Sequence, residues 1–91
     1  MIIARKFFFS GRVQGVGFRY FTQRVAARHQ IRGYVKNLDD GRVEALAQGS
    51  EKSVEAFKHD LTAGPRQSQV NDVEEIVIEP NDAYSSFRVE R

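Results

Sequence analysis

The amino-acid sequence predicts an α+β sandwich, in which two helices cover one face of an antiparallel sheet. Short apolar runs that alternate in polarity are separated by two segments whose apolar residues recur at helical spacing. These segments follow one another in the order β-α-β-β-α-β. The chain has 91 residues, of which 41% are hydrophobic and 11% aromatic, so it is globular and suffices for a single domain over 1–91.

The first half of the chain predicts a strand, a helix and a second strand. The strand covers 7–13, where Phe7, Phe9 and Val13 share one face and Phe8 lies on the other. From 19 to about 30 the apolar period becomes helical, and 31–38 predicts the second strand. We expect the buried side of the helix to consist of Phe18, Phe21, Val25 and Ala26.

The second half begins with a hairpin turn at Asp39-Asp40-Gly41, because an Asp-Gly pair tolerates the positive φ that such turns need. A third strand covers 42–48, with Leu46 on one face and smaller apolar residues on the other. Ser50 is a suitable N-cap for a second helix, which Gly64 ends. The apolar stripe of this helix consists of Val54, Phe57 and Leu61.

A fourth strand is predicted over 70–79, and 87–89 predicts an optional short last strand. Alternation in the fourth strand is imperfect, and either a bulge or burial on both faces explains it. The element order favours a ferredoxin-like sandwich. Strands one and two both run antiparallel to strand three between them, so their C-terminal ends lie at the same edge of the sheet.

The charged residues divide the chain into a basic and an acidic part. Residues 1–38 carry eight basic side chains and no acidic one, whereas 39–91 carry six basic and twelve acidic side chains. This division favours an anionic ligand or an electrostatic partner, although the two parts can also neutralise each other on one surface.

Several classes of protein are excluded by what the sequence lacks. It has no cysteine, hence no disulfide framework and no thiol nucleophile, and its two histidines match no metal-ligand spacing. The opening residues lack the apolar core of a signal peptide, and no apolar run is long enough to span a membrane. We therefore expect a cytoplasmic protein.

The segment from Gly11 to Arg19 joins a strand to the start of a helix. Glycines at 15 and 17 allow close approach of a ligand to the backbone, and free amides at the helix start favour negative charge. Arg19 can fold its planar guanidinium over the same place, which suits a phosphate. The segment lacks the Gly-Lys-Ser/Thr of a P-loop and the third glycine of the dinucleotide fingerprint. A simple tight turn explains the glycines equally well.

Asn37 ends the second strand, at the edge of the sheet where this loop also lies. Its amide offers a donor and an acceptor, so it can orient a water molecule beside a bound anion. The alternative is that Asn37 only caps the turn at Asp39-Asp40-Gly41.

These two segments carry a resemblance to a known family. Gly11-Arg12-Val13-Gln14-Gly15-Val16-Gly17-Phe18-Arg19 resembles the acylphosphatase signature G-x-V-Q-G-V-x-F-R. The stretch from Gly33 to Glu44 resembles the second signature of that family, G-x-V-x-N-x-x-D-G-x-V-E. Phe87-Arg88-Val89 resembles the C-terminal end of the family's sequences. One departure is Tyr34, where the family often has tryptophan.

The resemblance implies hydrolysis of the carboxyl–phosphate bond of small acyl phosphates. It implies that the phosphoryl group is bound by Gln14, Gly15, Val16, Gly17, Phe18 and Arg19, and that Asn37 orients the attacking water. Arg19 and Asn37 are then the catalytic residues. It further implies that the enzyme uses no metal or other cofactor and forms no phospho-enzyme, and we expect a monomer.

Two other classes of protein share this element order. RNA-binding modules place stacking aromatics on strands one and three, but strand three here has none, so we expect no nucleic-acid partner. A non-catalytic domain that binds a small anion would keep the loop at 11–19 but would not require Asn37.

Overall fold

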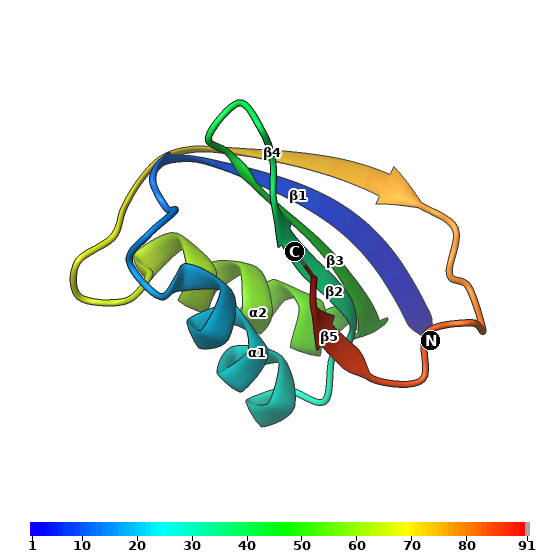
Figure 1. Ribbon diagram of the computed structural model, residues 1–91. Helices are drawn as coiled ribbons and strands as arrows, with labels where there is room; N and C mark the ends of the chain where they lie inside the picture. Colours follow the sequence, from blue (N-terminus) through cyan, green and yellow to red (C-terminus); the bar gives the residue numbers. More distant parts are fainter. Residues whose placement is uncertain (91) are drawn as a thin grey trace.

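The computed structural model describes residues 1–90. Its elements are β1 (Ile2–Arg12), α1 (Phe18–Arg28), β2 (Arg32–Asn37), β3 (Val43–Ser50), α2 (Glu51–Ala63), β4 (Gln69–Ile78) and β5 (Phe87–Val89). Both helices lie against one face of a curved sheet, and the loop from β1 to α1 lies at the same end of the sheet as the β2–β3 hairpin (Figure 1). No helix in the described range is long and apolar enough to cross a membrane. The predicted order and the ferredoxin-like sandwich are confirmed.

The sheet has the strand order β4-β1-β3-β2-β5. The pairs β1–β3, β1–β4 and β2–β3 are antiparallel, as expected, but β5 pairs parallel to β2. The sheet is therefore mixed rather than wholly antiparallel. The segment after β4 crosses the end of the sheet before β5 begins, and the Gly33 amide donates to the Ser86 carbonyl where β5 joins β2 (3.0 Å).

The core lies between the sheet and the helices and is rich in phenylalanine. Phe7, Phe9, Phe18 and Phe57 are each at most 1% exposed, and neighbouring rings in this group lie 5.6–6.2 Å apart. Phe21 was expected to be buried, but it is only half-buried at the margin of the core. Thr22 is buried instead, and its hydroxyl donates to the Phe18 carbonyl (2.8 Å), so this polar group is satisfied within α1.

Residues of the central strand β3 alternate between the two faces as expected, and both faces are buried. Leu46 and Gln48 point away from the helices but are only 4% and 1% exposed. Gln48 is covered by the segment that follows β4, where its amide bonds the backbone N–H and carbonyl of Asn81 (2.8 and 3.1 Å). Both polar atoms of the Gln48 side chain therefore have a hydrogen-bond partner.

The edge strand β4 is irregular, as its imperfect alternation of polar and apolar residues suggested. Asn71 has no partner opposite it, because the register shifts between Ser10 and Gly11 on β1. Gly11 has a φ of 123°, and a Cβ there would overlap the Gln69 carbonyl oxygen. The strand therefore has a bulge, but it precedes Val73, and from there to Ile78 the register opposite β1 is continuous, so the bulge does not account for the imperfect alternation. Val77 is 72% exposed, so burial on both faces is also wrong.

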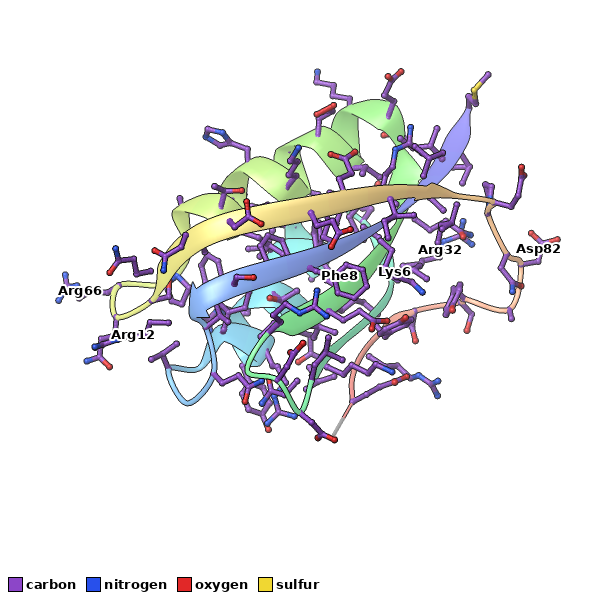
Figure 2. The ribbon with its side chains drawn as sticks, turned by 90° about the horizontal axis from the view of Figure 1, so that it is seen from above. Lys6, Phe8, Arg12, Arg32, Arg66 and Asp82 are labelled. Atoms are coloured by element: carbon purple, nitrogen blue, oxygen red, sulfur yellow. The ribbon has the colours of Figure 1, made fainter. Side chains whose placement is uncertain are left out.

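The face of the sheet turned away from the helices carries Lys6 and Phe8 (Figure 2). The Arg42 guanidinium lies over the Phe8 ring, 4.8 Å from its centroid. On the same face the Tyr34 hydroxyl donates to the carboxylate of Glu44, which is 8% exposed. Burial, together with this hydrogen bond and the charge of Glu44, raises the pKa of Tyr34.

Replacing Phe57 tests the core. Its side chain is fully buried against Phe7 and Phe87, so Phe57→Ala should lower the free energy of unfolding by about 3–5 kcal/mol. The exposed Val77→Ala is the control and should change it by less than about 0.5 kcal/mol. Urea unfolding measures both, and equal losses would contradict this description of the core.

Tyr34 predicts how stability depends on pH. Because its pKa is higher in the folded chain, the unfolded chain loses this proton first, near pH 10. The contribution of Tyr34 to the free energy of unfolding is therefore intact below about pH 10. As pH rises above this value, the free energy of unfolding should fall. Urea unfolding from pH 8 to 11 should show a shallower fall in Tyr34→Phe than in the wild type. The variant Tyr20→Phe, at an exposed position, should retain the fall, and an unchanged slope in Tyr34→Phe would contradict the prediction.

Candidate functional site

The loop between β1 and α1 owes its shape to two glycines. Gly15 and Gly17 have φ values of 74° and 76°, a conformation that favours glycine. Gly17 is the N-cap of α1, and no side chain caps the helix there. The backbone N–H groups in the first turn of α1 are therefore not satisfied by a capping side chain.

The amides of this loop are free. In residues 1–90, the consecutive N–H groups from Gln14 to Tyr20 donate to no protein acceptor, and the first such bond is from Phe21 to the Gly17 carbonyl (3.0 Å). Unpaired amides at the start of a helix attract an anion, because the helix dipole adds to their partial positive charge.

Arg19 stands in the first turn of α1, which contains no acidic residue. A cation in this place is unfavourable with respect to the helix dipole, and a bound anion would offset that cost. The side chain is held in place from the far end of the chain, because its Nη1 donates to the Glu90 carbonyl (2.9 Å).

Asn37 ends β2 beside the hairpin. Its Oδ1 is buried and has no hydrogen-bond donor among the described residues. Such an orphaned acceptor is costly in a folded protein, so it indicates a ligand or water partner. The hairpin turn lies at 38–42, where Gly41 has a φ of 95° and the Leu38 amide donates to the Arg42 carbonyl (2.8 Å). The backbone N–H and side chain of Arg42 lower the pKa of Asp40.

Two adjoining cavities contain these groups. The smaller, about 130 Å³, is lined by the loop and helix start together with Asn37: Val13, Gly15, Gly17, Phe18, Arg19, Tyr20 and Asn37. It is roughly four times the volume that one water occupies in the liquid. The larger, about 850 Å³, shares Arg19, Tyr20 and Asn37 and extends along β5.

The residues named from the sequence take different positions. Gly15, Gly17, Phe18 and Arg19 line the smaller cavity with Asn37. Val16 does not line it and packs against the core. The Gln14 side chain turns toward the hairpin, where its Nε2 donates to the carbonyls of Leu38 (2.8 Å) and Arg42 (2.9 Å). Among the named residues, therefore, Gln14 and Val16 can reach an anion in this cavity only through their amides.

Other residues of the site were not expected from the sequence. The larger cavity is also lined by Gln23, Phe87, Arg88 and Val89, and the Glu90 carbonyl holds Arg19. Gln23 lies one turn beyond Arg19, so helical spacing could have identified it. The contribution of β5 left no local signal, because it depends on pairing with β2.

The arrangement suits a small tetrahedral anion with a water beside it. Residues of the loop with unpaired amides, Arg19 and Asn37 all line the smaller cavity. No Asp, Glu or His of the described residues lines either cavity, and residues 1–90 contain no cluster of such side chains that could hold a metal ion.

Comparison with known proteins identifies the family. The family model for acylphosphatase matches residues 5–89. The acylphosphatase of Archaeoglobus fulgidus is 48% identical over 88 residues, which are 97% of this chain and 98% of that protein. The crystal structure of acylphosphatase from Bacillus subtilis matches with a TM-score of 0.94 and 37% identity over 100% of both chains. An acylphosphatase structure from Coxiella burnetii matches with a TM-score of 0.92 and 38% identity, over 98% of this chain and 93% of that one. With the signature loop and the asparagine brought into one cavity, these matches show that the chain belongs to the acylphosphatase family.

Proposed function

We propose that this acylphosphatase binds the phosphoryl group of an acyl phosphate in the smaller cavity and hydrolyses it with a water that Asn37 orients. The observation that carries the proposal is the meeting of unpaired amides, Arg19 and Asn37 around one cavity of about 130 Å³. The acyl group would extend into the larger cavity, which shares these two side chains.

The loop and Arg19 would stabilise the charge of the transferring phosphoryl group. In the loose transition state typical of phosphoryl transfer, little covalent chemistry falls to the protein, so positioning and electrostatic stabilisation dominate. The Arg19 side chain is tethered through one guanidinium nitrogen to the Glu90 carbonyl. The guanidinium has further N–H donors for phosphoryl oxygens, so this tether orients it without using up its capacity.

Asn37 would orient the water. The torsion of a terminal amide is broad and roughly two-fold, so Asn37 can turn Oδ1 toward a water in the cavity. A water that donates one hydrogen to Oδ1 keeps a lone pair for phosphorus. Its oxygen forms the new P–O bond while the P–O bond to the acyl group breaks, and the acyl group leaves as a carboxylate.

A phosphoryl oxygen of the substrate would take the proton of the attacking water, because no carboxylate or imidazole of the described residues lines either cavity. The products are a carboxylate and inorganic phosphate. Every group in this scheme belongs to one chain, so the proposed reaction does not require a second subunit.

Asn37 also distinguishes catalysis from simple anion binding. A site that only retained an anion would be lined by donors, since a carbonyl oxygen repels phosphate oxygens. The Asn37 amide adds an acceptor, Oδ1, to the donors of the loop and Arg19, and an acceptor suits a water that donates a hydrogen to it.

The first test is turnover of acetyl phosphate with EDTA present. Wild type should hydrolyse it at the same rate with and without EDTA. Arg19→Ala should lower kcat/KM by about 10²- to 10³-fold, the usual cost of removing a transition-state charge partner. The control is Arg24→Ala, on the exposed side of the same helix, which should stay within about twofold of wild type. Failure of the wild type to turn over would refute the enzymatic role.

The second test separates orientation of water from binding of phosphate. Asn37→Ala should lower kcat by on the order of 10²-fold, while inhibition by inorganic phosphate changes less than about threefold. Steady-state kinetics with phosphate as inhibitor measure both values. Unchanged kcat with weaker phosphate inhibition would show that Asn37 binds the anion instead of orienting water.

A further inference from the structure

The Gln14 side chain links the two segments that form the site. Its Nε2 donates both hydrogens across the end of the sheet, one to the Leu38 carbonyl (2.8 Å) and one to the Arg42 carbonyl (2.9 Å). Gln14 immediately precedes the glycines of the loop, and Leu38 immediately follows Asn37. One amide group thus spans from the loop that would bind phosphate to the hairpin that carries Asn37.

The two carbonyls that it binds are those that close the hairpin. The Leu38 amide donates to the Arg42 carbonyl (2.8 Å), and the Gly41 amide donates to the Leu38 carbonyl (3.2 Å). Each carbonyl has a second lone pair, and Gln14 occupies it. The bonds from Gln14 therefore add to the turn without competing with its own bonds.

Sheet pairing does not provide this link. β1 and β2 are separated by β3 and share no ladder of hydrogen bonds. The loop leaves β1 and the hairpin leaves β2 at one end of the sheet (Figure 1). In the part of the chain that the structure describes, no other side chain hydrogen-bonds the loop from 13 to 17 to the hairpin.

The opposite side of the hairpin is held separately. The Arg42 side chain bonds Asp40 (2.9 Å) and lies over the Phe8 ring on the open face of the sheet. These contacts fix the turn against the sheet. Sheet pairing places Asn37 opposite Val43, and the bonds from Gln14 fix the loop, which has already left β1, relative to the hairpin.

We infer that Gln14 is a positioning residue for the reaction, which sets Asn37 at the right distance and angle from the phosphate-binding loop. The inference rests on the proposed function for the roles of the loop and Asn37. It assigns the side-chain amide of Gln14 to the hairpin, so that only the backbone N–H of this residue is available to the anion. A shift of about 1 Å between a bound phosphoryl group and its water is enough to reduce a rate by on the order of 10²-fold.

The main test compares Gln14→Met with Gln48→Met. Methionine is similar in size but cannot donate these bonds. Gln48 is the matched control, because its side-chain amide also makes two hydrogen bonds to a loop backbone. Its partner is Asn81, in the segment that follows β4 and away from the hairpin. Both variants should lower Tm by similar amounts. Only Gln14→Met should lower kcat for acetyl phosphate, by roughly 10- to 100-fold, with inhibition by inorganic phosphate changed less than about threefold. Equal loss of kcat in the two variants, or no loss in Gln14→Met, would overturn the inference.

A double-mutant cycle shows whether Gln14 acts through Asn37. In the Asn37→Ala background, Gln14→Met should reduce kcat by less than about threefold, because there is no longer an oriented water to displace. If the full reduction persists, Gln14 acts in another way.

Gln14→Glu places a carboxylate opposite two carbonyls, so at pH 7 it should be slower than Gln14→Met. Activity of Gln14→Glu equal to wild type would contradict the need for two donors.

Hydrogen exchange tests the link without any turnover. The amides of Leu38 and Gly41 should exchange faster in Gln14→Met than in wild type, relative to core amides of β3. Unchanged exchange would show that Gln14 does not hold the hairpin. This readout stands even if acetyl phosphate is not hydrolysed, so failure of the proposed function and failure of this inference can be told apart.

Discussion

Antiparallel pairing of both β1 and β2 with β3 is the constraint on which the rest of the molecule depends. It makes β1 and β2 parallel to each other, so the glycine loop and Asn37 leave the sheet at one end. It also sets them a strand apart, with space between them for a small ligand. The burial of β3 on both faces gives this arrangement a rigid centre.

Local features were predictable from the sequence because their causes lie within a few residues. Ser50 caps α2 as expected, with its Oγ accepting from the Ser53 amide (3.2 Å), and Gly41 has the positive φ that its turn needs. Val54, Phe57 and Leu61 are buried along one stripe of α2. The meeting of the loop with Asn37 followed from topology alone, since two strands that flank a third must end together.

What could not be predicted depends on contacts between distant residues. Thr22 takes the buried place expected for Phe21 because the neighbouring helix and sheet decide which side of α1 faces inward. The direction of β5 depends on how the segment after β4 crosses the sheet. The resemblance placed Gln14 in the phosphate-binding loop but gave no role to its side chain, whose partners lie 24 and 28 residues further along the chain.

The tether between Arg19 and the Glu90 carbonyl spans 71 residues of sequence. A ribosome synthesises the glycine loop and Asn37 before it synthesises β5. The guanidinium can therefore reach its final orientation only after β5 has left the ribosome and paired with β2. A nascent chain would therefore acquire the tethered Arg19 only when β5 completes the sheet.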